Sequence, residues 1–426
     1  MTDRDALFQA ILANPDEDTP RLVFADWLEE NGDAEYARFI RTQIELAKLP
    51  EWDPLRVRTM FVEPVTFHLQ NGPHRPRLPL GLRWDHDAFR RGFASEVAAD
   101  TITGFVKNAP AVFAVAPVQA LKLWSNAGAP TPSLAPLADS ASLARLRCLY
   151  FRRSRLGEKE IRQLQDSPHA ANLTELAFEQ GIDPLQSAVS ALFSPPIGPR
   201  LTAVRFIGNG LGPGQVWFAI REVDLGRLRR LTFAAMGPTP LQATIHHTAE
   251  FIRSLPAGLL DLDLSDYEFG PGGVAALADA PATRSLQSLD LKHTRPGVPG
   301  VSALAGSAAL AGLRVLRLAS NSLGPTAANV LARSRHLAGL RILDLSHNPI
   351  GDTGAVALAE SPHLTNLVQL ELMHCGIGDK GAGAFLASPV AANLVRLSLL
   401  GHSGKNTISD RMKGALKKWF GNRVFV

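Results

Sequence analysis

The sequence predicts an α/β solenoid, in which parallel strands and short helices alternate along the chain, because one leucine pattern recurs through most of it. Successive copies begin 27 or 28 residues apart, with a single interval of 31. The chain has 426 residues, of which 46% are hydrophobic, so it is too long for one ordinary core but suits stacked repeats. The eleven copies open at Val118, Leu146, Leu173, Leu201, Leu228, Leu259, Leu286, Leu313, Leu340, Leu367 and Leu394.

The pattern itself assigns the residues of each copy to a strand, a turn and a helix. The clearest copy, residues 313–339, follows L-x-x-L-x-L-x-x-N-x-L, which is the signature of a leucine-rich repeat. In the copy that opens at Leu340, we expect Leu343 and Leu345 to point inward as well. Burial of each leucine contributes roughly 1.5–3 kcal/mol. Alternate strand residues such as Asp344 then face outward.

The repeats resemble the ribonuclease-inhibitor-like subclass of leucine-rich repeats over residues 118–426, because the helical halves are short and alanine-rich, as in GVAALADA. This resemblance implies a horseshoe with strands on the concave face and helices outside. We expect Asp352 to cap the helix of its own repeat. The turn residue of the pattern varies, and we expect the least regular turns near PTPLQATIHHTAE in the 31-residue repeat. This residue is Asn126, Ser154, Gly181, Asn209, Met236, Tyr267, Thr294, Asn321, Asn348, Cys375 or His402.

Residues 1–50 are predicted to form three short helices. Thr2 and Asp5 have the spacing of a capping box, and Pro20 suits the first position of a helix. The run DTPRLVFADWLEENGDAEYARFIRTQIELA resembles the repeat-companion domain found at the head of bacterial leucine-rich repeat proteins, with Ala25–Asp33 as its most specific part. The resemblance implies a bacterial protein with a helical head before its repeats, and it implies no reaction.

Three further segments complete the predicted organisation. Residues 51–90 are rich in proline and are expected to form a linker packed on the array, anchored by Trp52, Phe61, Phe67 and Trp84. The leucine-rich repeat domain spans residues 91–426. Its ends need caps, because the terminal repeats would otherwise expose leucines and unpaired backbone groups. The predicted caps are residues 91–117, with a strand near 93–97 and a helix over 102–113, and a helix over about 407–421.

The charge and cysteine content indicate an intracellular environment. Residues 1–50 carry 11 acidic and 5 basic side chains, whereas residues 118–426 carry 22 acidic and 31 basic ones. These opposite charges suggest either that the head docks on the repeats or that the repeats favour an acidic partner. Cys148 and Cys375 lie too far apart in a solenoid to form a disulfide. With no signal peptide and no membrane-length apolar segment, the sequence predicts a cytoplasmic protein.

The outward strand positions form the candidate binding surface. One such residue per repeat makes a central column, basic and aromatic in its first third and mainly acidic in its second half. Exposed Trp and Tyr side chains on a rigid strand are good anchors for a protein partner. The alternative is a solvated face with no partner. The predicted partner-binding residues are Lys122, Trp124, Tyr150, Arg152, Arg205, Asp261, Asp263, Asp290, Arg317, Asp344 and Glu371.

The function predicted from these residues is non-catalytic protein binding by a monomeric scaffold, because no motif specifies a reaction, a cofactor site or a metal site. A second hypothesis is regulation of the kind seen in ribonuclease inhibitors or in GTPase activators, where similar repeats occur. A third is nucleic-acid binding by the basic repeats. Its strongest motif is the run Arg145, Arg147, Arg152, Arg153 and Arg155. The pattern places Phe151 in the core, so this run is better explained as a scattered solvated surface.

Overall fold

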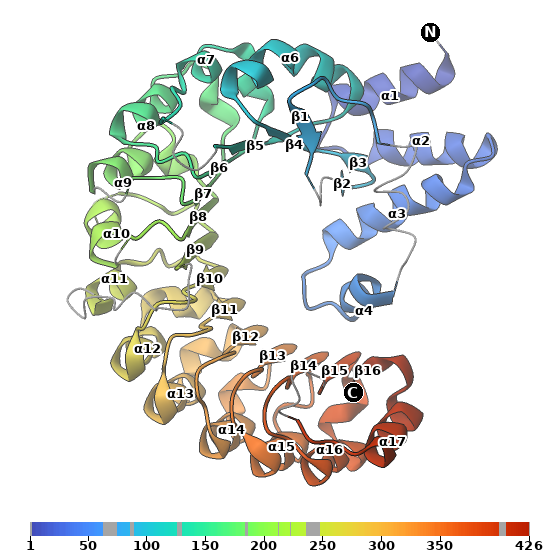
Figure 1. The fold of residues 1–426 in the computed structure, drawn as a ribbon, viewed down its shortest axis with the longest axis vertical. Coiled ribbons are helices and arrows are strands. Elements are labelled where there is room, and N and C mark those ends of the chain that lie inside the picture. The colour runs from blue at the N-terminus through green and yellow to red at the C-terminus, as the bar shows by residue number, and fades with distance from the viewer. Residues whose placement is uncertain are drawn as a thin grey trace. The chain divides into compact units, whose positions relative to one another are not determined.

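The computed structural model describes residues 2–62, 75–85, 89–125, 130–183, 186–211, 213–221, 223–235, 248–399 and 406–425. The chain divides into two compact units, which are considered separately below. The first unit contains Met1–Glu51 and Thr59–Arg205, and the second contains Trp52–Arg58 and Phe206–Val426. Within each unit, the repeat strands form one layer and the repeat helices lie on one side of it (Figure 1). We call the opposite side of the strand layer the strand face.

The sheet of the first unit begins with an antiparallel pair and continues with parallel strands. β1 (Leu82–Trp84) pairs antiparallel with β4 (Glu96–Ala99), and β4 pairs parallel with β5. A separate hairpin joins β2 (Phe89–Arg90) and β3 (Phe93–Ala94). The parallel strands after β4 are β5 (Ala120–Trp124), β6 (Cys148–Arg152), β7 (Glu175–Glu179) and β8 (Ala203–Ile207), in that order.

Helices of the first unit comprise a helical head and the outer layer of the repeats. The head helices are α1 (Asp3–Ala13), α2 (Thr19–Glu30) and α3 (Ala34–Lys48). The next helix along the chain, α4 (Pro54–Val62), begins in the segment assigned to the second unit. The outer helices are α6 (Ile102–Val115), α7 (Ala135–Ala138), α8 (Glu158–Gln165) and α9 (Gln186–Phe193), with 3-10 turns η1 (Ala141–Arg145), η2 (Ala170–Asn172) and η3 (Gly198–Arg200).

The second unit repeats the same strand–helix alternation, and its strands from β9 to β16 are parallel neighbours in chain order. The strands are β9 (Arg230–Ala234), β10 (Asp261–Asp263), β11 (Ser288–Asp290), β12 (Val315–Arg317), β13 (Ile342–Asp344), β14 (Gln369–Glu371), β15 (Arg396–Ser398) and β16 (Val424–Phe425). The helices are α10 (Pro213–Ile220), α11 (Thr248–Ser254), α12 (Gly270–Ala278), α13 (Gly297–Gly306), α14 (Pro325–Ala332), α15 (Gly351–Ala359), α16 (Asp379–Ala384) and α17 (Asp410–Phe420). The 3-10 turns are η4 (Pro281–Ser285), η5 (Ala308–Gly312), η6 (Arg335–Leu337), η7 (Phe385–Ala387), η8 (Val390–Asn393) and η9 (Gly421–Arg423).

The fold class predicted from the leucine pattern is confirmed: the structure is an α/β leucine-rich repeat solenoid with a helical region at its N-terminus. Leu340, Leu343 and Leu345 are all fully buried, as the pattern requires. The same holds for the core residues of the first unit, where Leu149 and Phe151 are fully buried on β6. Each strand therefore buries one row of side chains under the helices and leaves the alternate row on the strand face.

Asparagine side chains connect consecutive turns of the second unit. Asn348 accepts hydrogen bonds from the backbone N–H groups of Asn321 and Leu323, both at 2.9 Å. Its amide donates to the carbonyl oxygens of Leu318 and Leu345, at 2.8 and 2.9 Å. The buried side-chain amide of Asn348 thus accepts two hydrogen bonds and donates two, which explains why asparagine is the preferred residue here.

The last turn of the array corrects the sequence-based assignment. Asn406 accepts from the N–H groups of Cys375 and Ile377 at 2.8 and 3.0 Å, so it occupies the position that we assigned to His402. The pattern failed here because the final repeat contains extra residues before its turn. His402, Asn126, Met236 and most of PTPLQATIHHTAE lie outside the described residues.

Asp352 does not cap the helix of its own repeat, contrary to prediction. It occupies the first turn of α15, and its carboxylate accepts hydrogen bonds from the N–H groups of Gly378 and Gly381 at 2.7 and 2.9 Å. These groups are at the start of α16, so the aspartate caps the helix of the following repeat. Asp379 repeats this arrangement by binding Ser409 at the start of α17.

The helical head packs on the first repeats within the first unit. The capping box is present, since Thr2 Oγ1 accepts from Asp5 N–H at 3.2 Å and the Asp5 carboxylate accepts from Thr2 N–H at 3.0 Å. Tyr36 donates its hydroxyl proton to the carbonyl oxygen of Gly92 at 3.0 Å. Arg145 donates to Leu12 O at 3.0 Å. Arg147 forms an ion pair with Asp16 of the head, and Arg91 lies 3.4 Å from Asp18, so opposite charges meet where the head packs.

Candidate functional site

The strand register of the first unit brings three of the predicted partner-binding residues to one groove. Lys122 on β5 lies opposite Tyr150 on β6, which lies opposite Ala177 on β7. A groove of about 610 Å³ runs across these strands on the strand face, and it also contacts Arg205 of β8. Lys122 and Tyr150 are half-buried, whereas Arg205 is exposed.

The Lys122 ammonium group is held by two carboxylates and one aromatic ring. It lies 2.5 Å from Asp85 and 3.8 Å from Glu96, and its nitrogen is 4.6 Å from the centre of the Tyr150 ring. Burial, together with the neighbouring Asp85 carboxylate, raises the pKa of Glu96, and the Lys122 charge opposes this shift. The positive charge of Lys122 is thus largely balanced inside the groove.

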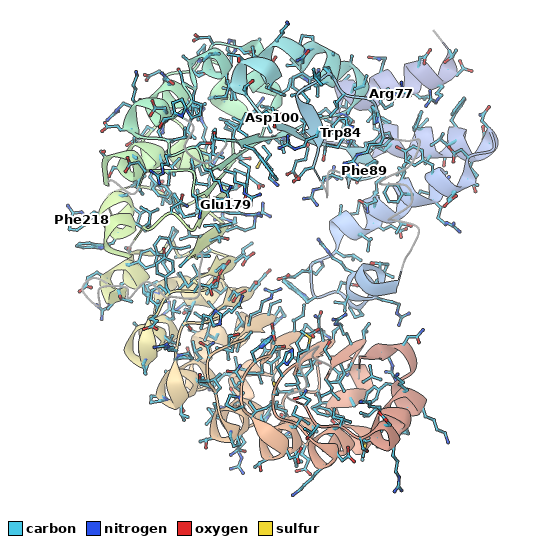
Figure 2. All side chains as sticks on the ribbon, in the orientation of Figure 1. Arg77, Trp84, Phe89, Asp100, Glu179 and Phe218 are labelled. Atoms are coloured by element: carbon cyan, nitrogen blue, oxygen red, sulfur yellow. The ribbon has the colours of Figure 1, made fainter. Side chains whose placement is uncertain are left out.

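Tyr150, Arg152 and Glu179 form a second connected group. The Tyr150 hydroxyl donates to the Glu179 carboxylate, and burial raises the pKa of that hydroxyl. Arg152 Nε lies 2.8 Å from the other oxygen of Glu179. Figure 2 shows Glu179 on the strand side of the first unit. Two of the predicted anchors are therefore fixed in position by one carboxylate that the sequence alone did not connect to them.

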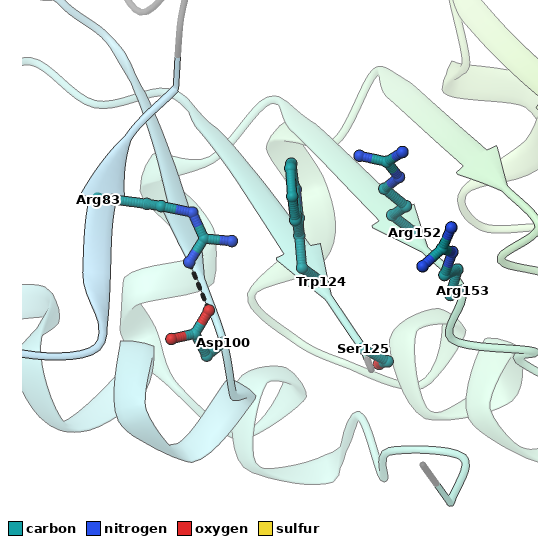
Figure 3. Close-up of a pocket in the computed structure, with 6 residues that line it drawn as sticks. All are labelled: Arg83, Asp100, Trp124, Ser125, Arg152 and Arg153. Carbon is teal, nitrogen blue, oxygen red and sulfur yellow. Dashed lines mark hydrogen bonds and ion pairs between the residues drawn. The ribbon is translucent and has the colours of Figure 1, made fainter. Parts of the chain in front are cut away.

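Trp124 and Arg152 line a separate pocket, of about 550 Å³, at the carboxyl ends of β5 and β6. The other lining residues are Arg83, Asp100, Ser125 and Arg153 (Figure 3). Sequence reasoning missed the contributions of Arg83, Asp85, Glu96 and Asp100. These residues lie before the first repeat, and the pairing of β4 with β5 and of β1 with β4 places them beside the repeat strands.

The register of the second unit aligns the other predicted residues in one row. Thr232, Asp263, Asp290, Arg317, Asp344, Glu371 and Ser398 lie opposite one another on consecutive strands. Asp261 lies on β10, two positions before Asp263, the member of the row on that strand. Burial and the carboxylates of Asp263 and Asp344 raise the pKa of Asp290 to about 6, against the opposing effects of its bond to Lys292 N–H and of the Arg317 charge.

The aspartates of this row also have a structural function. Asp263 accepts a hydrogen bond from Ser265 N–H at 2.9 Å, Asp290 from Lys292 N–H at 2.9 Å, and Asp344 from Ser346 N–H at 2.8 Å. Each bond closes an Asx turn at the end of a strand. Substitution of these residues by lysine would therefore remove a turn contact together with the charge.

Glu371 does not present an outward charge, contrary to the expectation for the acidic half of the column. Its residue is 6% exposed, and its carboxylate lies 2.6 Å from Arg396 Nε. Arg396 lies on the next strand, two positions before Ser398. A cross-strand ion pair of this kind neutralises both side chains, so Glu371 contributes less to an acidic surface than Asp263 or Asp344.

The dense arginine run does not form one basic patch. Arg145 binds Leu12 O, and Arg147 forms an ion pair with Asp16, so both contact the helical head. Arg152 pairs with Glu179, and Phe151 is in the core as predicted. The remaining two arginines, Arg153 and Arg155, are exposed on the turn after β6.

No group of three or more His, Cys, Asp or Glu side chains within the ranges given above is arranged to hold a metal ion. No helix in the described part of the chain is long and apolar enough to cross a membrane.

Comparison with known proteins found one family model and a set of solved structures to which the chain is similar. A family model described as Leucine Rich repeat matches residues 339–359 and 363–386. An internalin (inlF) from Listeria monocytogenes is 18% identical, with a TM-score of 0.41, and the match covers 76% of this chain and 85% of that chain. A chain in the structure of the Rad7 and Elc1 complex in yeast is 14% identical, with a TM-score of 0.42. The match covers 76% of this chain and 83% of that chain. No curated protein matches the chain.

The chain therefore has the fold of a leucine-rich repeat solenoid, and two of its segments match the Leucine Rich repeat family model.

Proposed function

We propose that this protein is a non-catalytic scaffold that binds a protein partner on its strand face, chiefly at the groove of the first unit. The observation that carries the proposal is the groove of about 610 Å³, in which Lys122, Tyr150 and Arg205 from three strands face one space. An aromatic ring and an arginine on rigid strands are the residue types that most often dominate binding energy at protein interfaces. The aspartate row of the second unit would be a further contact surface.

The charge arrangement also favours a protein partner over nucleic acid. The groove contains Asp85 and Glu96 beside its basic residues, and carboxylates of this kind repel a phosphate backbone. A mixed charge pattern is suited to a folded protein surface with complementary charges.

The test is a pull-down from native lysate followed by mass spectrometry, with four baits. The baits are the intact chain, Arg205→Glu, the triple variant Asp263→Asn/Asp290→Asn/Asp344→Asn, and Lys159→Glu. Asparagine keeps the oxygen that accepts the turn hydrogen bond, so the triple variant removes charge with little effect on the fold. Lys159 is exposed on α8, away from the strand face, and is the matched control.

We expect one protein to be retained by the intact chain and by Lys159→Glu but lost with Arg205→Glu. With that partner purified, Arg205→Glu should weaken binding by about tenfold or more, which corresponds to about 1.4 kcal/mol. Loss with the triple variant alone would move the site to the second unit. Equal capture by all four baits would show that the strand face is not the binding surface.

A further inference from the structure

The pocket at the carboxyl ends of β5 and β6 has an unusual combination of side chains. Three arginines, one aspartate, one serine and one tryptophan surround a volume of about 550 Å³. The arginines come from β1, from β6 and from the turn after β6, so the sheet brings them together from positions far apart in the sequence. Figure 3 shows Arg83 on one side of the Trp124 indole, and Arg152 and Arg153 on the other.

Trp124 holds two of these guanidinium groups in fixed positions. The guanidinium carbons of Arg83 and Arg152 each lie 4.7 Å from the centre of a Trp124 ring, and the two arginines lie on opposite sides of the indole (Figure 3). A guanidinium group that stacks on an aromatic face keeps its N–H donors directed outward in its own plane. Both faces of the indole are occupied, so the pocket offers hydrogen-bond donors to a ligand rather than a surface for ring stacking.

Two of the three arginines in the pocket form ion pairs, and Arg153 is the one that is available to a ligand. Arg83 pairs with Asp100, and Arg152 pairs with Glu179 at 2.8 Å. Arg153 is exposed and forms no ion pair with any residue in the described ranges. Each paired guanidinium group has five N–H donors, so it retains donors after binding one carboxylate. The pocket lining itself carries three positive charges and one negative charge.

The backbone around Arg153 is fixed before any ligand binds. Arg153 has a φ of 57°, and its N–H donates to Glu179 O at 2.8 Å. The adjacent Ser154 is buried, and its hydroxyl lies 3.3 Å from the hydroxyl of Ser125. A ligand that contacts Arg153 therefore has to order only the side chain, which reduces the entropy cost of binding.

We propose that this pocket binds a phosphate monoester, carried by a phosphorylated side chain or by a small phosphorylated molecule. Guanidinium groups bind phosphate oxygens through paired N–H donors, and those of Arg152 and Arg153, which lie on the same side of Trp124 (Figure 3), suit a dianion with three terminal oxygens. A carboxylate has one charge and two oxygens, and a phosphodiester has one charge. Both should bind more weakly. The site does not rest on the proposed scaffold function.

The test is calorimetric titration of the full chain with N-acetyl-phosphoserine amide, inorganic phosphate, acetate and a single-stranded oligonucleotide. The informative variant is Arg153→Gln, because Arg153 makes no ion pair within the described residues that the fold would lose. Arg155→Gln is the matched control, since Arg155 is also exposed, also has a positive φ, 47°, and lies on the same turn outside the pocket lining.

Phosphoserine amide should bind, and Arg153→Gln should weaken it by about tenfold while Arg155→Gln changes it less than about twofold. Binding of inorganic phosphate with the same sensitivity, but not of phosphoserine amide, would support the site and indicate a small phosphorylated molecule. Three results would overturn the proposal. They are no phosphate binding at millimolar concentration, equal weakening by both variants, and preference for acetate or the oligonucleotide.

Discussion

Individual side chains of the strand face combine a structural contact with an electrostatic one. Asp290 accepts a backbone hydrogen bond from Lys292 and lies between Asp263 and Arg317 in its row. The hydrogen bond favours its ionised form, whereas burial and the neighbouring carboxylates disfavour it, and the second effect is larger. A residue identified from sequence as a contact for a partner thus already influences the stability of its own turn.

Replacement of Asp290 by asparagine should stabilise the protein at neutral pH. The pKa of Asp290 is about 6 in the folded chain, above its unfolded value of about 3.9, so its contribution to stability is present below pH 4 and is lost as the pH rises through 6. Asparagine keeps the turn acceptor and removes the charge. We expect Asp290→Asn to be more stable at pH 7.5, by at most roughly 2–3 kcal/mol.

Thermal unfolding of the intact chain and of Asp290→Asn, compared at pH 7.5 and pH 4, measures this effect. The difference between them should be largest at pH 7.5 and small at pH 4. Asp279, which is exposed at the end of α12, provides the control Asp279→Asn. If the difference in unfolding temperature between the intact chain and Asp290→Asn were the same at both pH values, the raised pKa of Asp290 would be contradicted.

At the scale of the element, helices of the last repeats are capped by their neighbours. α16 has only six residues, and its first N–H groups bind Asp352 of the preceding repeat. Ser409, the N-cap of α17, binds Asp379 of the preceding repeat in the same way. A helix as short as α16 has little stability of its own, so its formation depends on the preceding repeat.

Asp352→Ala should therefore destabilise α16 rather than α15. Loss of the two hydrogen bonds and of a negative charge at a helix N-terminus costs about 1–2 kcal/mol. Urea unfolding followed by circular dichroism would detect this as a lower midpoint. Asp352→Asn, which keeps one acceptor oxygen, should recover part of the loss. Glu360→Ala, an exposed change at the end of α15, should have no effect, and an equal shift for both alanine variants would refute the cap.

At the scale of the whole molecule, stability is built from contacts between consecutive repeats. Asn348 makes hydrogen bonds to its own repeat and to the repeat before it. In such an array, the free energy of unfolding is approximately a sum of repeat and interface contributions. A change at one turn should consequently weaken the adjacent repeats most.

Asn348→Ala tests this view through hydrogen exchange read by mass spectrometry. The substitution leaves several buried backbone groups without partners, at a cost of about 1–3 kcal/mol for each unsatisfied group. Peptides that contain β12, β13 and β14 should exchange faster, while peptides from the first unit remain unchanged. Asn366→Ala is the control, because Asn366 is exposed and its amide donates one bond, to Ala338 O at 2.9 Å. Faster exchange throughout both units would show that the chain unfolds as one cooperative body.

The repeat array was predictable because its information is local and periodic. Leu340, Leu343 and Leu345 are buried for the same reason as their counterparts 27 residues away, and a parallel register places equivalent positions opposite one another. The column from Thr232 to Ser398 could therefore be written down from spacing alone. The same periodicity gave no warning that Glu371 pairs with Arg396, since an ion pair depends on the side chains chosen at two neighbouring positions.

The sequence by itself determined the class of fold, the repeat boundaries and the rows of residues on each strand face, because a repeated pattern of buried leucines has one favourable way to stack. Only the tertiary structure decided which charges remain available in those rows. Asp85, Glu96 and Arg83 precede the repeats, and no periodic rule connects them to Lys122 or Trp124. Pairing of β4 with β5 and of β1 with β4 places them there, and the groove and the arginine pocket acquire their chemistry from those contacts.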